Sequence, residues 1–204
     1  MRKMILVTVI VFLAITVGCT NDNNENSIID IVLTQDEIND LLFLREEEKL
    51  ARDVYLYSYD KYGTIVFNNI ASSESSHMNS VLILLNKYNI EDPILENRGE
   101  FRNTTLQKIY NDLIELSDIS LLEALRVGNI IEDLDIKDLT LNESRTEKID
   151  LLSLYDFLKC GSQNHLRNFN NQLISNGGNY VPEYLTQIAF ETIVNSTNEW
   201  CGFN

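Results

Sequence analysis

Two side chains that bind metal ions well, Glu74 and His77, stand three residues apart in a segment that we predict to be helical. Residues at this spacing lie about one turn apart on one face of a helix, so both can reach the same metal ion. Apolar residues recur every three or four positions around them, at Val66, Ile70, Val81, Leu84 and Tyr88. Glu74 and His77 continue this stripe, which predicts that they face the core. A solvated helix face explains most isolated Glu-x-x-His pairs, but a carboxylate in an apolar stripe is costly to bury alone. We therefore expect partners from other helices.

A second predicted helix carries the run Glu46-Glu47-Glu48. Only Glu48 lies in line with the apolar residues Leu41, Leu44, Ala51 and Tyr55. We therefore predict that Glu48 faces the core and that Glu46 and Glu47 are solvated. Glu48 is either a metal ligand or a carboxylate at the edge of the core that pairs with a neighbouring Arg or Lys.

Two more predicted helices repeat the pattern. Glu132 and Asp135 align with Leu121, Leu125, Gly128 and Leu139, and His165 aligns with Leu154, Leu158, Gly161 and Phe169. His165 and His77 are the only two histidines of the chain, and both lie in apolar stripes. The simpler alternative for each histidine is a core residue with an ordinary hydrogen bond. The simpler alternative for Asp135 is a solvent-exposed helix face that it shares with Asp133. Together the candidate ligands favour a metal site.

These stripes require long helices, and the low content of proline and glycine agrees with that. We predict helices over 34–62, 66–88, 120–139 and 143–175, with a short one near 106–114 and another over 183–194. A capping box formed by Thr34 and Glu37 marks the first start, and Gly63 marks the first end. The sequence thus predicts an all-α four-helix bundle with a long crossover between the second and third long helices and a short C-terminal helix.

The N-terminal residues have the pattern of an export signal. Arg2 and Lys3 precede an apolar run over 5–15, and Thr16-Val17-Gly18-Cys19 resembles a bacterial lipobox. We predict a signal peptide over 1–18, lipidation of Cys19, a flexible polar tether over 19–33 and a helical domain over 34–204. The protein would then be an exported lipoprotein, anchored to the membrane at the cell surface or in the periplasm. A plain secretory signal or an uncleaved anchor are the alternatives.

Charge and cysteine content limit the partners. The chain of 204 residues has a formal net charge of −15, which argues against nucleic acid as a partner. Besides Cys19, the cysteines are Cys160 and Cys201. In an exported protein such a pair predicts a disulfide, and two unpaired thiols are the alternative.

Four motifs carry a resemblance to a known family: EEEKLARDVY at 46–55, SESSHM at 73–78, IEDLDI at 131–136 and GSQNHLR at 161–167. Over residues 33–194 the chain is similar to an uncharacterised ferritin-like family, related to rubrerythrin. The resemblance implies a ferritin-like bundle that holds one or two iron ions, with manganese or zinc as alternatives. The family carries no established function, so our first hypothesis rests on the ligands: an oxidoreductase that reacts with oxygen or peroxide and receives electrons from an external donor. Whether the protein forms a homodimer is left open.

The resemblance fails at one ligand. Rubrerythrin-like proteins carry Glu-x-x-His on the fourth helix as well, and here Ser162 stands three residues before His165. A bridging carboxylate is therefore missing, and Asp135 is the candidate to replace it. The alternative function is a non-catalytic, membrane-tethered helical binding or structural module with a degenerate metal site.

Overall fold

The computed structural model describes residues 32–202. Within that range the chain forms six helices and no strand, which confirms the prediction of an all-α protein. The helices are α1 (Gln35–Tyr62), α2 (Ile65–Lys87), α3 (Thr104–Ser117), α4 (Leu121–Glu143), α5 (Ile149–Ser175) and α6 (Gln187–Val194). None of these six combines the length and hydrophobicity that a membrane-spanning helix needs.

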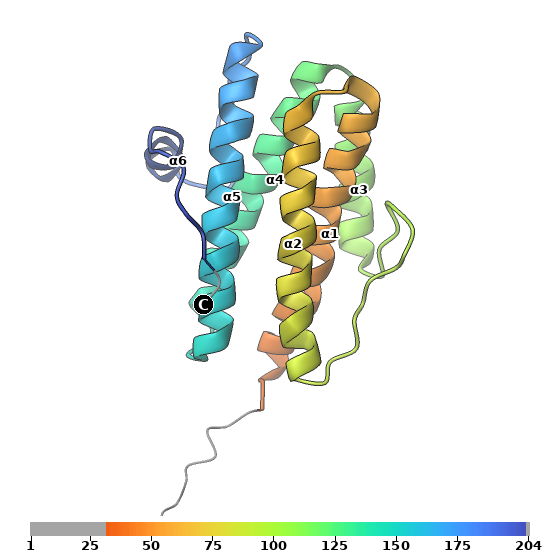
Figure 1. The fold of residues 1–204 in the computed structure, drawn as a ribbon, viewed down its shortest axis with the longest axis vertical. Helices are drawn as coiled ribbons and strands as arrows, with labels where there is room; N and C mark the ends of the chain where they lie inside the picture. The colour runs from red at the N-terminus through yellow and green to blue at the C-terminus, as the bar shows by residue number, and fades with distance from the viewer. Residues whose placement is uncertain (1–31, 203–204) are drawn as a thin grey trace, which may run out of the picture. The chain divides into compact units, whose positions relative to one another are not determined.

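The four long helices pack in two antiparallel pairs, α1 with α2 and α4 with α5. The pairs meet through α1 against α4 and α2 against α5 (Figure 1). Ion pairs join the helix ends: Lys87 at the end of α2 contacts Asp150 of α5 at 2.7 Å, and Asp40 of α1 contacts Arg145, just after α4, at 2.7 Å. The short helix α3 belongs to the connection between α2 and α4, and it packs on both α1 and α4.

Each of the four long helices contributes to two separate apolar clusters. The first cluster includes Val54, Phe67, Leu125 and Phe169. The second includes Leu44, Leu85, Leu139 and Leu158. Along every one of these helices a stretch of buried charged or polar residues lies between its two apolar segments. The core therefore contains a polar layer between two apolar ones.

Local sequence determines the ends of α1 as predicted. The Thr34 side chain accepts a hydrogen bond from the backbone N–H of Glu37, and the Glu37 carboxylate accepts one from the backbone N–H of Thr34. At the other end Gly63 has a φ of 65°, a left-handed conformation that favours glycine. These contacts need only neighbouring residues, so the sequence pattern was sufficient to find them.

Two predicted helix starts were wrong, the first because of a local turn and the second because of a tertiary contact. Residues up to Glu143 continue α4, and α5 begins at Ile149, after a tight turn in which the N–H of Arg145 bonds to the carbonyl of Asn142. The last helix begins at Gln187 rather than at 183. Asp133 accepts hydrogen bonds from the backbone N–H groups of residues 183, 184 and 185 and so holds them in a loop.

Candidate metal centre

The six residues predicted to bind metal all lie in the polar layer of the core. Glu48 comes from α1, Glu74 and His77 from α2, Glu132 and Asp135 from α4, and His165 from α5. None of them is more than 6% exposed. Four helices that are distant in sequence thus bring carboxylates and imidazoles to one level of the core.

Glu74 lies between the two histidines. Its Oε2 is 2.7 Å from Nδ1 of His77, and its Oε1 is 2.8 Å from Nδ1 of His165. A second carboxylate approaches each imidazole: Glu48 Oε2 is 3.2 Å from His77 Nδ1, and Glu132 Oε2 is 3.5 Å from His165 Nδ1. Glu48 and His77 form one Glu/His set, and Glu132 and His165 form the other. Both sets share the carboxylate of Glu74. One atom each of Glu74, His77 and His165 lie within 4.8 Å of one another, close enough to hold a metal ion.

Neighbouring side chains orient three members of the centre. Nε2 of His165 lies 3.0 Å from the Ser73 hydroxyl, which leaves Nδ1 facing the carboxylates. The Tyr55 hydroxyl donates a 2.5 Å hydrogen bond to Oε1 of Glu132. Gly161 makes room for His77, because a Cβ atom at that position would lie 2.5 Å from Nε2 of the imidazole. Tyr59, one turn further along α1 than Tyr55, packs against the first apolar cluster instead.

Several polar atoms of the centre are buried without a hydrogen bond from any residue in 32–202. They are Oε1 of Glu48, Oε1 of Glu74, Oδ1 of Asp135 and Nδ1 of His165. Although Glu74 Oε1 and His165 Nδ1 are only 2.8 Å apart, the two groups are not aligned as a hydrogen bond. Once the imidazole proton is lost, the converging carboxylate and imidazole lone pairs are an arrangement that a cation fits. The donor set therefore fits a divalent metal ion.

Without a metal ion, protons supply the positive charge of the centre. Burial disfavours the imidazolium, but the charges of Glu74 and Glu132 outweigh burial and raise the pKa of His165 to about 10. Burial also disfavours the imidazolium form of His77, but the charges of Glu74 and Glu48 have a larger effect and raise the pKa of His77 well above its ordinary value. At Glu74 burial would raise the pKa, but the charges of His165 and His77 have a larger effect and lower it. A metal ion that binds here must displace protons from both rings.

Ser162 and Asp135 contact each other directly. The Ser162 hydroxyl donates a hydrogen bond to Oδ2 of Asp135. Burial, followed by the charges of Glu48, Glu47 and Glu132, raises the pKa of Asp135 well above its ordinary value. The Asp135 carboxylate of α4 therefore reaches Ser162, the residue of α5 that stands three positions before His165.

The prediction that Glu46 and Glu47 are solvated was wrong: they are 4% and 5% exposed. The connection before α3, together with α3 itself, covers their side of α1. Glu46 accepts hydrogen bonds from the backbone N–H groups of Arg102 (2.6 Å) and Asn103 (3.2 Å). The periodicity of α1 could not show this cover, because it comes from residues more than 50 positions away.

Asp133 is also buried, so the alternative of a wet face shared by Asp133 and Asp135 was wrong. It is fully buried and accepts hydrogen bonds from the Tyr180 hydroxyl, at 2.7 Å, and from the backbone of the 183–185 loop. Its role is to hold that loop.

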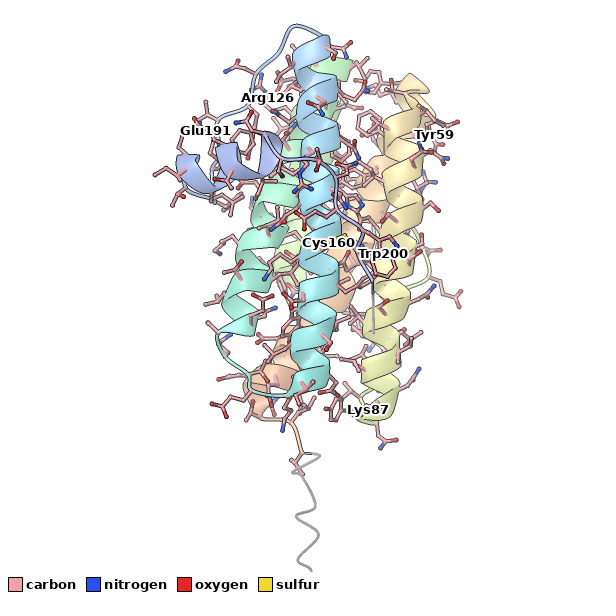
Figure 2. All side chains as sticks on the ribbon, turned by 60° about the vertical axis from the view of Figure 1, so that its left-hand side comes forward. Tyr59, Lys87, Arg126, Cys160, Glu191 and Trp200 are labelled. Carbon is pink, nitrogen blue, oxygen red and sulfur yellow. A yellow bond between two sulfur atoms is a disulfide. The ribbon has the colours of Figure 1, made fainter. Side chains whose placement is uncertain are left out.

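A disulfide joins Cys160 of α5 to Cys201 in the C-terminal segment. Trp200 lines a surface pocket together with both cysteines, and Figure 2 shows Cys160 and Trp200 next to each other. The predicted lipidation site, Cys19, lies outside the described residues.

Comparisons with known proteins place the chain in a family and identify a relative of known structure. Residues 37–197 match the uncharacterised protein domain DUF2202. The chain is 44% identical over 168 residues to the uncharacterised protein MJ0754 of Methanocaldococcus jannaschii, covering 82% of this chain and 91% of that protein. The crystal structure of the hypothetical protein MJ0754 from Methanococcus jannaschii is similar, with a TM-score of 0.81 and 43% identity over 82% of this chain and 97% of that one.

Proposed function

The chain belongs to the DUF2202 family, and from its buried Glu/His layer we propose that it is a metal-binding, ferritin-like protein. In this proposal α1, α2, α4 and α5 form a ferritin-like four-helix bundle. Its centre holds two divalent ions, iron first, with manganese or zinc as alternatives. Glu48 and His77 would hold one ion, Glu132 and His165 would hold the other, and Glu74, which lies between the two histidines, would contribute to both.

The observation that carries the proposal is the position of Glu74. Each of its oxygens lies within 2.8 Å of a different imidazole Nδ1, inside a layer shielded from solvent. A structural carboxylate normally has its oxygens satisfied by aligned donors, whereas Oε1 of Glu74 has none among the described residues. Unaligned oxygen and nitrogen atoms that face one another support a metal ion between them.

Charge balance supports two ions. Two divalent ions carry four positive charges, and the four carboxylates of the proposed centre, Glu48, Glu74, Glu132 and Asp135, balance them when both imidazoles are neutral. This balance requires Asp135, whose carboxylate accepts a hydrogen bond from the Ser162 hydroxyl of α5. A mixed carboxylate and imidazole shell suits iron, manganese or zinc.

We propose that the chemistry is oxidation or reduction with oxygen or peroxide. Bound iron would supply the electrons, and an external donor would restore them. The chain's own residues shape the site: Tyr55 holds Glu132, Ser73 leaves Nδ1 of His165 free to bind, and the apolar clusters exclude water.

One observation favours a second candidate, a non-catalytic structural or binding module. The raised pKa values of His77 and His165 favour two imidazolium ions, which neutralise two of the four carboxylates without any metal, and burial raises the pKa of Asp135, which favours its neutral form. In that case the layer is a set of buried ion pairs. The two candidates differ in metal content.

The test is elemental analysis of the purified chain, before and after reconstitution with Fe²⁺, Mn²⁺ or Zn²⁺. The proposal predicts two ions per chain, and binding lost in Glu74→Gln. The control Glu91→Gln changes a side chain that is 86% exposed and should bind as the wild type does. One ion per chain would replace the dinuclear proposal with a mononuclear one. No bound ion would leave the structural module.

We also propose that the domain is an exported lipoprotein, anchored to the membrane through Cys19. The support is the charged, apolar and lipobox-like order of residues 1–19. Cys19→Ser should release the protein from membranes or block its maturation. Membrane retention without incorporation of a labelled fatty acid would contradict the proposal.

A further inference from the structure

A small apolar pocket of about 70 Å³ lies where the short helix α3 packs on α1 and α4. Seven of its nine lining residues are leucine or isoleucine, and all three helices contribute to them, through Leu50, Leu106 and Leu134 among others. The other two are Tyr184 and Glu47. None of the six candidate metal ligands lines this pocket, so its role is separate from that of the proposed centre.

Glu47 is the one charged side chain of the lining. It is 5% exposed, and its Oε1 is buried without a hydrogen-bond partner among the described residues. Other buried carboxylates of α1 outside the centre are satisfied: Glu46 accepts a hydrogen bond from a backbone N–H group, and Asp53 pairs with Lys49 at 2.6 Å. A carboxylate left alone in an apolar wall is destabilising, so a donor on a bound molecule would account for Glu47.

The lining selects the charge of a ligand. It contains no Lys, Arg or His, so it offers an anion no partner. A charged donor forms a hydrogen bond about twice as strong as a neutral one, and a positive charge also neutralises a buried carboxylate. The ligand that matches Glu47 best is therefore a cation with N–H groups to donate.

The apolar walls and the volume limit the rest of the ligand. Leucine and isoleucine side chains require a hydrocarbon stem beside the cationic group. An apolar cavity of about 150 Å³ accommodates the six carbon atoms of benzene, so about 70 Å³ accommodates about three or four heavy atoms. An amine of the size of propylamine has both the stem and the charge.

We propose that this pocket is a binding site for a short primary alkylammonium ion. The ammonium group donates to Oε1 of Glu47, and the stem contacts the leucine and isoleucine side chains. Tyr184 is 43% exposed and marks the side from which the ion enters. Asp133 accepts a hydrogen bond from the backbone N–H of Tyr184 and so fixes this edge of the pocket.

The test titrates the purified chain with three probes of similar size: n-propylammonium, n-propanol and propionate. Binding is followed by NMR, through the methyl resonances of leucine and isoleucine. Propylammonium should shift the methyl groups of the lining and bind at least about tenfold more tightly than propanol, and propionate should not bind. Equal affinity for propylammonium and propanol would overturn the ionic contact. The absence of any shift with all three probes would overturn the site.

Two variants locate the bound ion. Glu47→Gln keeps the shape of the side chain and removes its charge, so it should weaken propylammonium binding at least about tenfold. Leu134→Phe fills the pocket from a partly buried position and leaves Glu47 in place, and it should abolish binding. Wild-type affinity in either variant would overturn the proposal, because the ion would then bind elsewhere on this acidic protein.

The matched control is Glu46→Gln. It removes the same charge from a buried side chain one residue away that does not line the pocket. Glu46→Gln should bind propylammonium as the wild type does. A loss in Glu46→Gln as large as that in Glu47→Gln would overturn the direct contact with Glu47.

Discussion

Replacing Gly161 by Ala should impair metal binding without unfolding the protein. A Cβ atom on residue 161 would lie 2.5 Å from Nε2 and 2.6 Å from Cε1 of His77. To reach an ordinary contact of 3.4 Å, the imidazole must move by 0.9 Å. It cannot move straight back, because Nδ1 already lies 2.7 Å from Glu74. We expect the ring to turn away from its place in the centre.

The expected effect of Gly161→Ala combines two opposing changes in the stability of the metal-free protein with one change in metal affinity. Alanine improves helix propensity by about 1 kcal/mol, and overpacking costs about 1–3 kcal/mol, so the metal-free protein should lose about 0–2 kcal/mol. Metal–nitrogen distances tolerate only about 0.2 Å, so the displaced ring no longer binds. Loss of a ligand should weaken metal binding at least about 100-fold, or about 2.7 kcal/mol. At excess metal this removes about 5–11 °C of the metal-induced rise in melting temperature.

The assay is a thermal melt of wild type and Gly161→Ala, each with a chelator and with excess Zn²⁺. Gly128→Ala is the control: its Cβ would lie 2.5 Å from Phe169, so it overpacks the apolar core instead of the centre. Gly128→Ala should lower the melting temperature both with the chelator and with Zn²⁺, while the rise in melting temperature that Zn²⁺ causes stays largely the same. An undiminished gain in Gly161→Ala would refute the role assigned to His77.

Three further predictions concern the bridge, the disulfide and pH. Asp135→Asn should lower the metal count from two ions to one, and adding Ser162→Glu to that variant should restore two; an unchanged count in Asp135→Asn would exclude Asp135 as a ligand. Reducing the bond between Cys160 and Cys201, which are 41 residues apart, should cost about 4 kcal/mol on the chain-entropy model, measured by urea unfolding with and without reductant. If the free energy of unfolding hardly changes on reduction, the disulfide to the C-terminal segment contributes nothing to stability. Because the pKa of His165 is raised to about 10 in the folded protein, its proton stabilises the metal-free form fully below pH about 6.5, and this effect is lost as pH rises towards 10. The gain in melting temperature from metal should therefore grow between pH 6 and pH 9, and a constant gain would contradict proton displacement.

The sequence pattern correctly predicted features that depend on neighbouring residues or on helical periodicity. The cap at Thr34 and the left-handed Gly63 need only their neighbours, and both ends of α1 were predicted correctly. Periodicity also predicted burial of Glu74, His77 and His165, because each continues a stripe of core residues on its own helix.

The pattern was insufficient where burial depends on distant segments. Glu47 is off the main stripe of α1 and is buried because α3 packs on that side of the helix. The distances around Glu74 and the contact of Ser162 with Asp135 depend on how four helices pack together, which no single stripe specifies. The space at Gly161 has the same origin: the sequence shows a glycine but not the imidazole opposite it.

The most direct test of the metal centre is anomalous diffraction from crystals of the protein reconstituted with Zn²⁺, measured above the zinc absorption edge. A dinuclear centre should give two peaks in the polar layer, one about 2.0–2.1 Å from Nδ1 of His77 and one at the same distance from Nδ1 of His165, with Glu74 in contact with both. A layer without an anomalous peak, or peaks confined to exposed carboxylates, would contradict it.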